Sequence, residues 1–233
     1  VEIIGQDQAL TAEVLRVANS SFYGGLTEIR TINDAAVRLG VPEVMRLATL
    51  VTEKGQYRVA TRGLEAYIDP LWHHAVTVAQ GARWLAKKLG FGDVENEAFI
   101  GGLLHDVGNL VLVRVIDEII AGGEIDARLS PTLVREILAT AHCEQGYRLA
   151  RTWGLPETYC EIIRDHDQDD LAQAGTLMNL VCLADKACMQ LGIGLQHDET
   201  IVLEATEEAF ALGVKDITLA ELSIMLEDSA ALV

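Results

Sequence analysis

The sequence predicts an all-α protein, and three observations point to this class. Apolar residues recur at helical spacing along almost all of the 233 residues, and no long alternating run indicates strands. Half of the residues are hydrophobic but only 5% are aromatic, a composition that favours packed helices over a sandwich or barrel. Glycines and prolines stand where helices would end and begin. The chain is long enough for one large domain or two small ones.

The first four expected helices each have a start or stop signal. Asn33 can cap a helix that ends before Gly40, and Pro42 stands where a first-turn proline is tolerated. Gly90 ends the next long helix, and a further apolar pattern follows it. We therefore expect helices over residues 33–39, 42–59, 64–89 and roughly 94–119.

The second half of the chain is punctuated in the same way. Ser130-Pro131 is a strong helix start, Gly154 a stop and Pro156 a new start. The spacing of apolar residues adds three later helices. The expected helices here span residues 131–154, 156–164, 171–191, 199–212 and 218–226, with exposed connections at 165–170 and 192–198.

A seam at Thr61-Arg62-Gly63 divides the expected helices into parts. Residues 1–63 form a small N-terminal helical layer, 64–192 a larger helical body and 193–233 the C-terminal helices. The chain opens on Val1-Glu2 rather than on Met, so we expect it to lack its natural beginning.

The charge excludes several classes of partner. Lys and Arg total 18 against 35 Asp and Glu, a formal net charge of −17. Such acidity repels phosphate backbones and anionic lipid, and no basic patch offsets it, so we expect neither a nucleic-acid nor a membrane partner. No apolar run approaches the ~18 residues of a membrane span. The four cysteines form no C-x-x-C pair, which is typical of small buried side chains in a reducing cytoplasm.

The stretch GGLLHDVGNLVL, residues 101–112, places a His-Asp pair among glycines. Each glycine inside a helix costs about 1 kcal/mol relative to alanine, so these glycines indicate a need for close approach. The neighbours of His105 three and four residues away are three glycines and Asn109. This bare ridge admits a second helix, a ligand or an ion, and the sequence alone leaves these alternatives open.

Two further polar residues lie on or beside apolar helix stripes. Asp185 has Val181, Cys182, Cys188 and Met189 as its helical neighbours, and a buried carboxylate needs a cation, a hydrogen-bond network or a metal. His74 borders a stripe beside Val78, whereas His73 points more to the side. A single residue of this kind is more often a core residue with hydrogen-bond partners than a metal ligand. Several, on separate helices of one bundle, indicate a metal site made from inward side chains.

These residues carry a family resemblance. His74, His105-Asp106 and Asp185 resemble the H…HD…D signature of the HD superfamily of metal-dependent phosphohydrolases. The segments ANSSFYGGLTEIRTINDAAVRLG, WHHAVTVAQGARWLA, ENEAFIGGLLHDVGNLVL and AHCEQGYRLARTWGLPETYCEIIRDHD resemble its branch called HDOD, the HD-related output domain. They cover most of residues 7–190 in the order that the family uses.

The resemblance implies a single domain with an HD-like multi-helix bundle, found in bacterial signalling proteins. It also implies one or two divalent ions of iron, manganese or zinc, with Asp106 able to bridge them. Asp167 stands where the superfamily often has a second histidine. The ligand positions that the resemblance implies are His74, His105, Asp106, His142, His166, Asp167 and Asp185.

Two departures weigh against the hydrolysis of cyclic dinucleotides. Enzymes of that kind resemble HDxGK at the central helix, whereas this chain has Asn109 in place of the lysine. The GYP motif that they carry is absent after His166-Asp167. The first hypothesis is thus a cytoplasmic regulatory output module with an HD-type metal-binding pocket that is structural or vestigial, and with other signalling proteins or domains as partners. The second is a metal-dependent phosphohydrolase acting on a nucleotide or phosphoester, with a small phosphorylated ligand. We assign no catalytic residue, and a metal or redox sensor stays a minor alternative.

Overall fold

The computed structural model describes residues 32–40, 59–61, 63–123, 130–152, 155–168 and 174–231. The chain divides into two compact units, Val1–Arg58 with Ala231–Val233, and Val59–Ala230. Every regular element among the described residues is a helix, which confirms the all-α class. In the first unit, α3 (Ile32–Leu39) confirms the helix expected over 33–39. The helix expected over 42–59 lies almost entirely outside the described residues.

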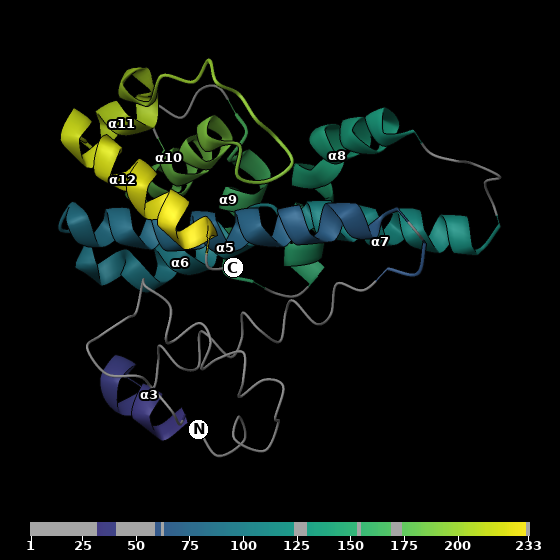
Figure 1. The fold of residues 1–233 in the computed structure, drawn as a ribbon, viewed down its shortest axis with the longest axis horizontal. Coiled ribbons are helices and arrows are strands. Elements are labelled where there is room, and N and C mark those ends of the chain that lie inside the picture. Colours follow the sequence, from purple (N-terminus) through teal and green to yellow (C-terminus); the bar gives the residue numbers. More distant parts are fainter. Residues whose placement is uncertain are drawn as a thin grey trace. The chain divides into compact units, whose positions relative to one another are not determined.

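The unit Val59–Ala230 holds all the other described helices (Figure 1). Two short 3₁₀ turns, η1 (Gly92–Val94) and η2 (Leu203–Ala205), connect some of them. The α-helices are α5 (Glu65–Lys88), α6 (Glu95–Leu104), α7 (Val107–Ala121), α8 (Pro131–Thr152), α9 (Glu157–Asp165), α10 (Thr176–Leu191), α11 (Glu207–Ala211) and α12 (Asp216–Ala230).

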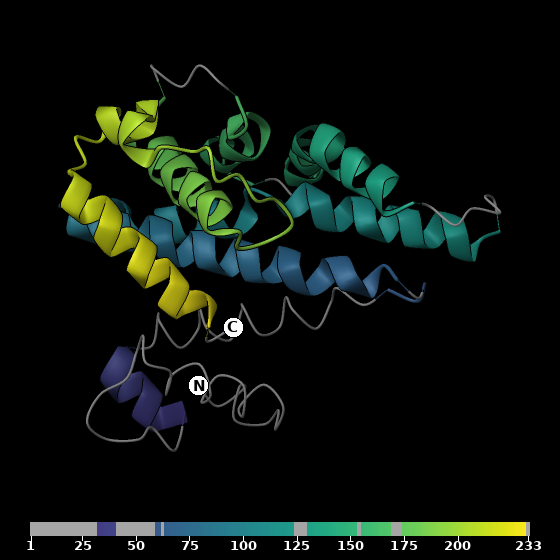
Figure 2. The same cartoon turned by 45° about the horizontal axis from the view of Figure 1, so that its top comes forward.

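The long helix α5 forms the centre of this unit. It packs against α6, α10 and α12, while α7 packs against α8 and α8 against α9. Figures 1 and 2 both show α12 crossing α5. The main core lies between these helices and is wholly aliphatic at its centre, where Val78, Leu85, Leu180, Leu183 and Leu222 are fully buried. The helices of this bundle also carry the polar side chains described below.

The helix expected over 94–119 is wrong as a single element. It is two helices, α6 and α7, separated at His105 and Asp106, and Asp106 has a non-helical backbone (φ −103°, ψ 13°). The apolar pattern continues across the break, so periodicity could not reveal it. Successive residues of a continuous helix point about 100° apart. The break instead lets His105 and Asp106 face one centre.

Three later helices also differ from the expectation. The single helix expected over 199–212 is the turn η2 followed by the five-residue α11. Thr206 separates them because its backbone is extended and its Oγ1 accepts a hydrogen bond from the Ala209 N–H at 3.2 Å. Helix α10 begins at Thr176, after the extended Gly175, rather than near residue 171. Helix α12 extends beyond the expected 218–226 at both ends.

The glycines around His105 serve close helix packing. A Cβ on Gly102 would lie 2.7 Å from the Ala79 Cα in α5, and one on Gly108 would lie 1.9 Å from the His142 carbonyl oxygen in α8. A Cβ on Gly146 in α8 would lie 3.1 Å from the Gly108 nitrogen. Neighbouring helices thus fill the bare ridge, and they bring α5 and α8 close to the His-Asp pair.

One stretch among the described residues, Gly92–Ala121, is long and apolar enough to cross a membrane by composition. This finding differs from the expectation that no apolar run approaches the length of a membrane span. Its most apolar window is 61% buried inside the protein, and the helix is interrupted at residues 105 and 106. Burial of this kind is typical of the core helix of a bundle.

Candidate metal centre

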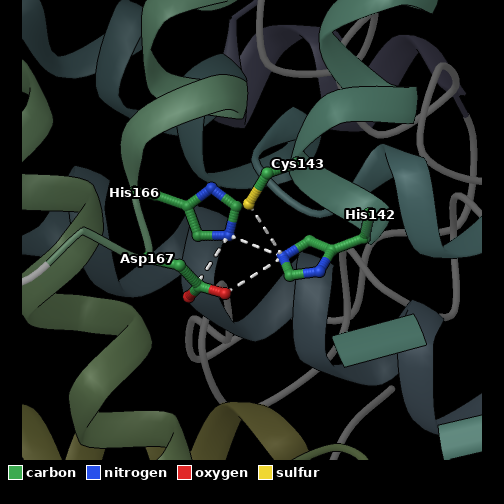
Figure 3. Close-up of side chains that lie close together, drawn as sticks. All are labelled: His142, Cys143, His166 and Asp167. Atoms are coloured by element: carbon green, nitrogen blue, oxygen red, sulfur yellow. Dashed lines mark hydrogen bonds and ion pairs between the residues drawn. The ribbon is translucent and has the colours of Figure 1, made fainter. Parts of the chain in front are cut away.

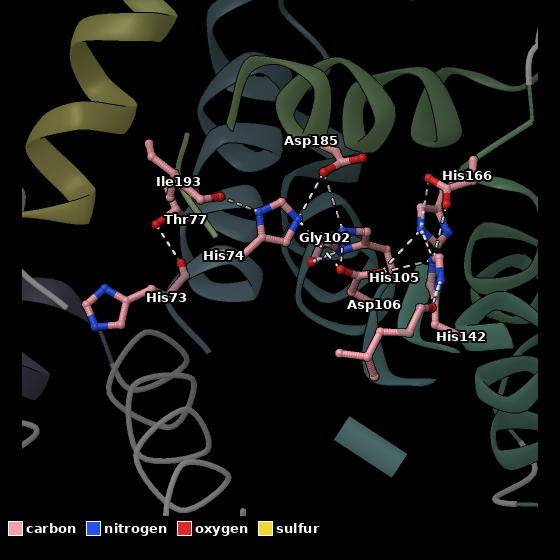
Figure 4. Close-up of polar contacts among 12 residues, drawn as sticks. His73, His74, Thr77, Gly102, His105, Asp106, His142, His166, Asp185 and Ile193 are labelled. Atoms are coloured by element: carbon pink, nitrogen blue, oxygen red, sulfur yellow. Dashed lines mark hydrogen bonds and ion pairs between the residues drawn. The ribbon is translucent and has the colours of Figure 1, made fainter. Parts of the chain in front are cut away.

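The side chains that the sequence singled out converge on one place in the bundle (Figure 4). They come from three helices and two helix ends, and all but Asp106 and Asp167 belong to buried residues. His73, by contrast, points away from the cluster, as expected. The converging set is His74 from α5, His105 and Asp106 from the α6–α7 junction, His142 from α8, His166 and Asp167 from the end of α9, and Asp185 from α10.

The first half of the cluster is formed by His74, His105 and Asp185. The Asp185 Oδ1 lies 3.0 Å from the His74 Nε2 and 3.7 Å from the His105 Nε2. The Asp106 Oδ2 lies 3.7 Å from the His74 Nε2 and 3.8 Å from the His105 Nε2. Two ring nitrogens and two carboxylates therefore face the same small space.

The second half is formed by His142, His166 and Asp167 (Figure 3). The Asp167 Oδ2 lies 3.2 Å from the His142 Nε2, and its Oδ1 lies 3.7 Å from the His166 Nε2. The two Nε2 atoms are 3.3 Å apart. The Asp106 Oδ1 lies 3.3 Å from the His142 Nε2 and 3.5 Å from that of His166. Asp106 thus gives one oxygen to each half, which is the arrangement of a bridging carboxylate.

Backbone carbonyls fix the orientation of all four rings. The Nδ1 of each ring lies within hydrogen-bond distance of a carbonyl oxygen, which only accepts, so Nδ1 carries the donated proton. Every Nε2 is consequently directed to the centre, as in histidines that bind metals. The Nδ1 partners are Ile193 for His74 (2.9 Å), Gly102 for His105 (2.7 Å), Leu138 for His142 (2.8 Å) and Ile162 for His166 (3.1 Å).

The turn after α10 belongs to the site, although we expected it to be only an exposed connection. Gly192 ends α10 in the left-handed region (φ 68°), and the carbonyl of Ile193 then reaches His74. A Cβ on Gly194 (φ 123°) would lie 3.0 Å from the His74 ring. In the sequence, Gly192 and Gly194 indicate a turn after α10, but they do not indicate that this turn contacts His74.

The charges of the cluster are strongly coupled. Burial alone would lower the pKa of His74, but its hydrogen bond and charge interaction with Asp185 outweigh burial and raise the pKa to about 9. Burial would also lower the pKa of His166, but Asp106 outweighs it and raises the value to about 9. For His142, the contacts with Asp167, Cys143 and Asp106 outweigh burial and raise the pKa to about 11. At neutral pH the metal-free cluster therefore holds protons between ring nitrogens and carboxylates.

The carboxylates shift in the complementary direction. Burial would raise the pKa of Asp106 and Asp185, but the surrounding histidines outweigh burial and hold both values well below the ordinary range. The pKa of Asp167 is lowered as well, chiefly through His142 against the opposing effect of burial. All three aspartates are thus ionised at neutral pH and available as anionic ligands.

One buried atom tests whether a metal ion fits. The His105 side chain is only 1% exposed, and its Nε2 has no hydrogen-bond partner. An orphaned buried nitrogen is costly, and a cation in the centre would satisfy it. The donors around it, imidazole and carboxylate, suit iron, manganese or zinc. The residues present therefore fit a divalent transition metal.

A cavity of about 150 Å³ opens onto the cluster. Besides the cluster it is lined by apolar side chains and by three polar residues that the sequence analysis did not weigh as a group, namely Asn109, Arg135 and Gln196. Asn109 is buried, whereas Arg135 is solvent-exposed. Arg135 is the one Arg or Lys among the described lining residues. Its exposed position on α8 is typical of any surface arginine, so its residue type and spacing do not distinguish it.

An all-α bundle around a buried histidine–aspartate cluster defines the class of this protein. The model of the HDOD domain matches residues 1–169, and the chain belongs to the HDOD family. Asp185 and the turn that supports His74 lie beyond the matched residues.

One relative and one solved structure match over most of this chain. An uncharacterized protein of Treponema pallidum (strain Nichols) is 31% identical over 170 residues, which are 71% of this chain and 32% of that protein. The chain thus spans about a third of that relative's length. The crystal structure of an HDOD domain protein with unknown function from Geobacter sulfurreducens has a TM-score of 0.73 and 27% identity, over 99% of this chain and 83% of the other.

Two other solved structures share the fold. A protein of Shewanella amazonensis SB2B, provisionally named as a metal-dependent phosphohydrolase, has a TM-score of 0.74 at 20% identity and covers 99% of this chain and 82% of its own. A response regulator of Methylococcus capsulatus (strain Bath) has a TM-score of 0.52 at 26% identity, over 95% and 87%.

Proposed function

We propose that the chain is a regulatory output domain of bacterial signalling whose cluster holds two divalent metal ions. One observation carries this proposal: four buried Nε2 atoms, each fixed by a backbone carbonyl, surround Asp106, which offers one oxygen to each half. His74, His105 and Asp185 would hold one ion, His142, His166 and Asp167 the other. The partners would be other signalling proteins or domains in the cytoplasm.

The pocket supports regulation rather than the hydrolysis of a cyclic dinucleotide. Its volume of about 150 Å³ is below the ~300–1,000 Å³ of ordinary ligand sites. Asn109, which replaces the lysine of the hydrolytic motif, is 4% exposed and brings no positive charge. The family assignment and the likeness to a response regulator fit a signalling role.

The test is the metal content of protein purified without a polyhistidine tag. We expect about two equivalents of transition metal, and a clear loss in His105→Ala and Asp185→Ala. His197→Ala is the matched control, since His197 is half-exposed and pairs with Glu199 outside the cluster. Protein that holds no metal after anaerobic, metal-replete preparation would contradict the proposal.

A phosphohydrolase acting on a small phosphoester is the second candidate, and Arg135 is the observation that favours it. Bound divalent ions would supply Lewis acidity toward phosphate oxygens. The guanidinium of Arg135, which lines the same cavity, provides a fork of donors suited to a phosphate group. A ligand as small as a phosphomonoester matches the cavity better than a dinucleotide does.

Turnover of p-nitrophenyl phosphate and nucleoside monophosphates by metal-loaded protein separates the two candidates. If the protein is an enzyme, Arg135→Ala should raise KM at least about 10-fold. Arg148→Ala, on the same helix and paired with Glu144, should leave KM unchanged. No turnover with two bound metals supports the regulatory domain.

A further inference from the structure

Cys143 lies in the second half of the cluster, and the proposed function does not use it. From the sequence, all four cysteines are expected to be small buried side chains. Cys143 follows His142 on α8, and its Sγ lies 3.3 Å from the His142 Nε2 (Figure 3). Unlike Cys160, Cys182 and Cys188, it is only partly buried, and none of those three joins a donor group among the described residues.

The other cysteines have surroundings that explain them without a metal. The Sγ atoms of Cys160 and Cys182 each lie 3.6 Å from a backbone carbonyl oxygen, and Cys188 packs in the main apolar core. Cys143 instead has imidazole and carboxylate groups around its thiol. The surroundings of the Cys143 thiol are therefore polar and rich in possible metal ligands. A cysteine that served only as a small apolar side chain would not need such surroundings.

The distances in this half match the needs of a small cation. The donor atoms of His142, Cys143, His166 and Asp167 all lie within 4.8 Å of one another. Zinc bonds of ~2.0–2.3 Å in a tetrahedron place neighbouring donors about 3.3–3.7 Å apart. The His142 Nε2 lies 3.3 Å from the His166 Nε2, 3.3 Å from the Cys143 Sγ and 3.2 Å from the Asp167 Oδ2.

A second observation shows that this centre is built for a cation. The buried Nε2 of His105 has no hydrogen-bond partner and belongs to a donor group with Asp106 and His166, and His166 is shared with the group of Cys143. The rings of His105 and His166 pack edge to face with centroids 4.9 Å apart. The cysteine is therefore one member of a connected set of donors, rather than an isolated thiol.

We propose that Cys143 is a metal ligand, which makes this half a nitrogen, sulfur and oxygen site selective for zinc. The inference rests on the proposed function, since it names the metal of one of its two positions. The thiol loses its proton to solvent, and the thiolate donates to the metal beside His142, His166 and Asp167. Soft thiolate ligands favour zinc, whereas the other half, with only nitrogen and oxygen donors, lacks this preference. Asp106 Oδ1 provides a fifth donor, a number that zinc accepts.

Cobalt(II) loading of the metal-free protein tests the ligand directly. We expect two equivalents of Co²⁺ and a thiolate-to-cobalt charge-transfer band in the near ultraviolet. Cys143→Ser should lose this band while its far-ultraviolet circular dichroism is unchanged, and Cys160→Ala should keep the band. Bound Co²⁺ without the band, or a band that survives in Cys143→Ser, overturns the role of Cys143 alone. No Co²⁺ binding would overturn the proposed function as well.

Metal preference gives an independent readout. In competition titrations with a chelator, Cys143→Ser should weaken Zn²⁺ binding by at least about 10-fold at one of two positions. Mn²⁺ affinity should stay within about 2-fold, because manganese prefers oxygen and nitrogen donors. Equal losses for both metals, or no loss for zinc, would contradict a thiolate ligand. Zn²⁺ should also protect Cys143 from alkylation by iodoacetamide, as read by mass spectrometry.

Discussion

Asp106 presents one carboxylate oxygen to each half of the cluster, so a change here should act on both of the proposed metal positions. We expect Asp106→Ala to weaken both by at least about 10-fold, because each loses an anionic ligand. Asp167→Ala should weaken only the position of His142 and His166. Calorimetric titration of metal-free protein with Mn²⁺ measures the two classes of site. If Asp106→Ala spares one position, Asp106 does not bridge.

At the same scale, the sequence predicted some of the site and missed the rest for physical reasons. Asp185 and His74 could be selected because a polar group on an apolar stripe needs a partner. The resemblance supplied His142, His166 and Asp167. Cys143 could not be selected, because a cysteine has the same pattern as a small apolar residue. The role of the Ile193 carbonyl could not be predicted from residue type, since every residue has a backbone carbonyl.

Among the elements, the contact of α7 with α8 depends on Gly108 and Gly146, which bring His142 toward Asp106. Gly108→Ala should destabilise the protein by about 3 kcal/mol or more, because its Cβ would meet the His142 carbonyl oxygen, which is backbone and cannot turn away. Metal binding should weaken with it. Chemical denaturation measures the loss.

Gly92→Ala is the matched control for this prediction. Gly92 begins η1, has no positive φ, and a Cβ there would have open space. Its effect should stay within about 0.5 kcal/mol of the wild type, as for ordinary surface changes. If Gly92→Ala and Gly108→Ala lower the free energy of unfolding by similar amounts, close packing of α7 against α8 does not explain the effect of Gly108→Ala.

The periodicity of apolar residues predicted where the long helices lie. It did not predict the helix ends that position the site residues. The break between α6 and α7 leaves apolar residues on both sides, so the pattern of 94–119 is continuous although the backbone is not. Short elements such as α11 fail for another reason. Five residues are too few for a helical period to be distinguished from the apolar residues of a turn.

For the whole molecule, the cluster links stability to pH in opposite ways with and without metal. The pKa values of His74 and His166 are about 9, above the ordinary 6.5, so their ion pairs stabilise the metal-free fold fully below pH ~6.5 and are lost as pH rises through 9. The melting temperature of metal-free protein should therefore fall between pH 6.5 and 9.5. Circular dichroism in the presence of EDTA measures it.

Metal should reverse this trend. Bound ions replace the protons on Nε2, so raising the pH removes a competitor and increases the stabilisation by metal. The difference in melting temperature between loaded and metal-free protein should grow from pH 6.5 to 9.5. In the Asp106→Ala variant it should shrink at every pH. A difference that falls as the pH rises would argue against ligands that bind protons in the metal-free state.

The turn after α10 connects the cluster to the last part of the described chain. His74 has its Nδ1 bonded to the carbonyl of Ile193, and the residues that follow lead into α11 and α12. If a partner pulled this segment outward, the ring would lose its tether and swivel away from Asp185. A displacement of this turn would thereby reach the histidine–aspartate cluster through a single hydrogen bond.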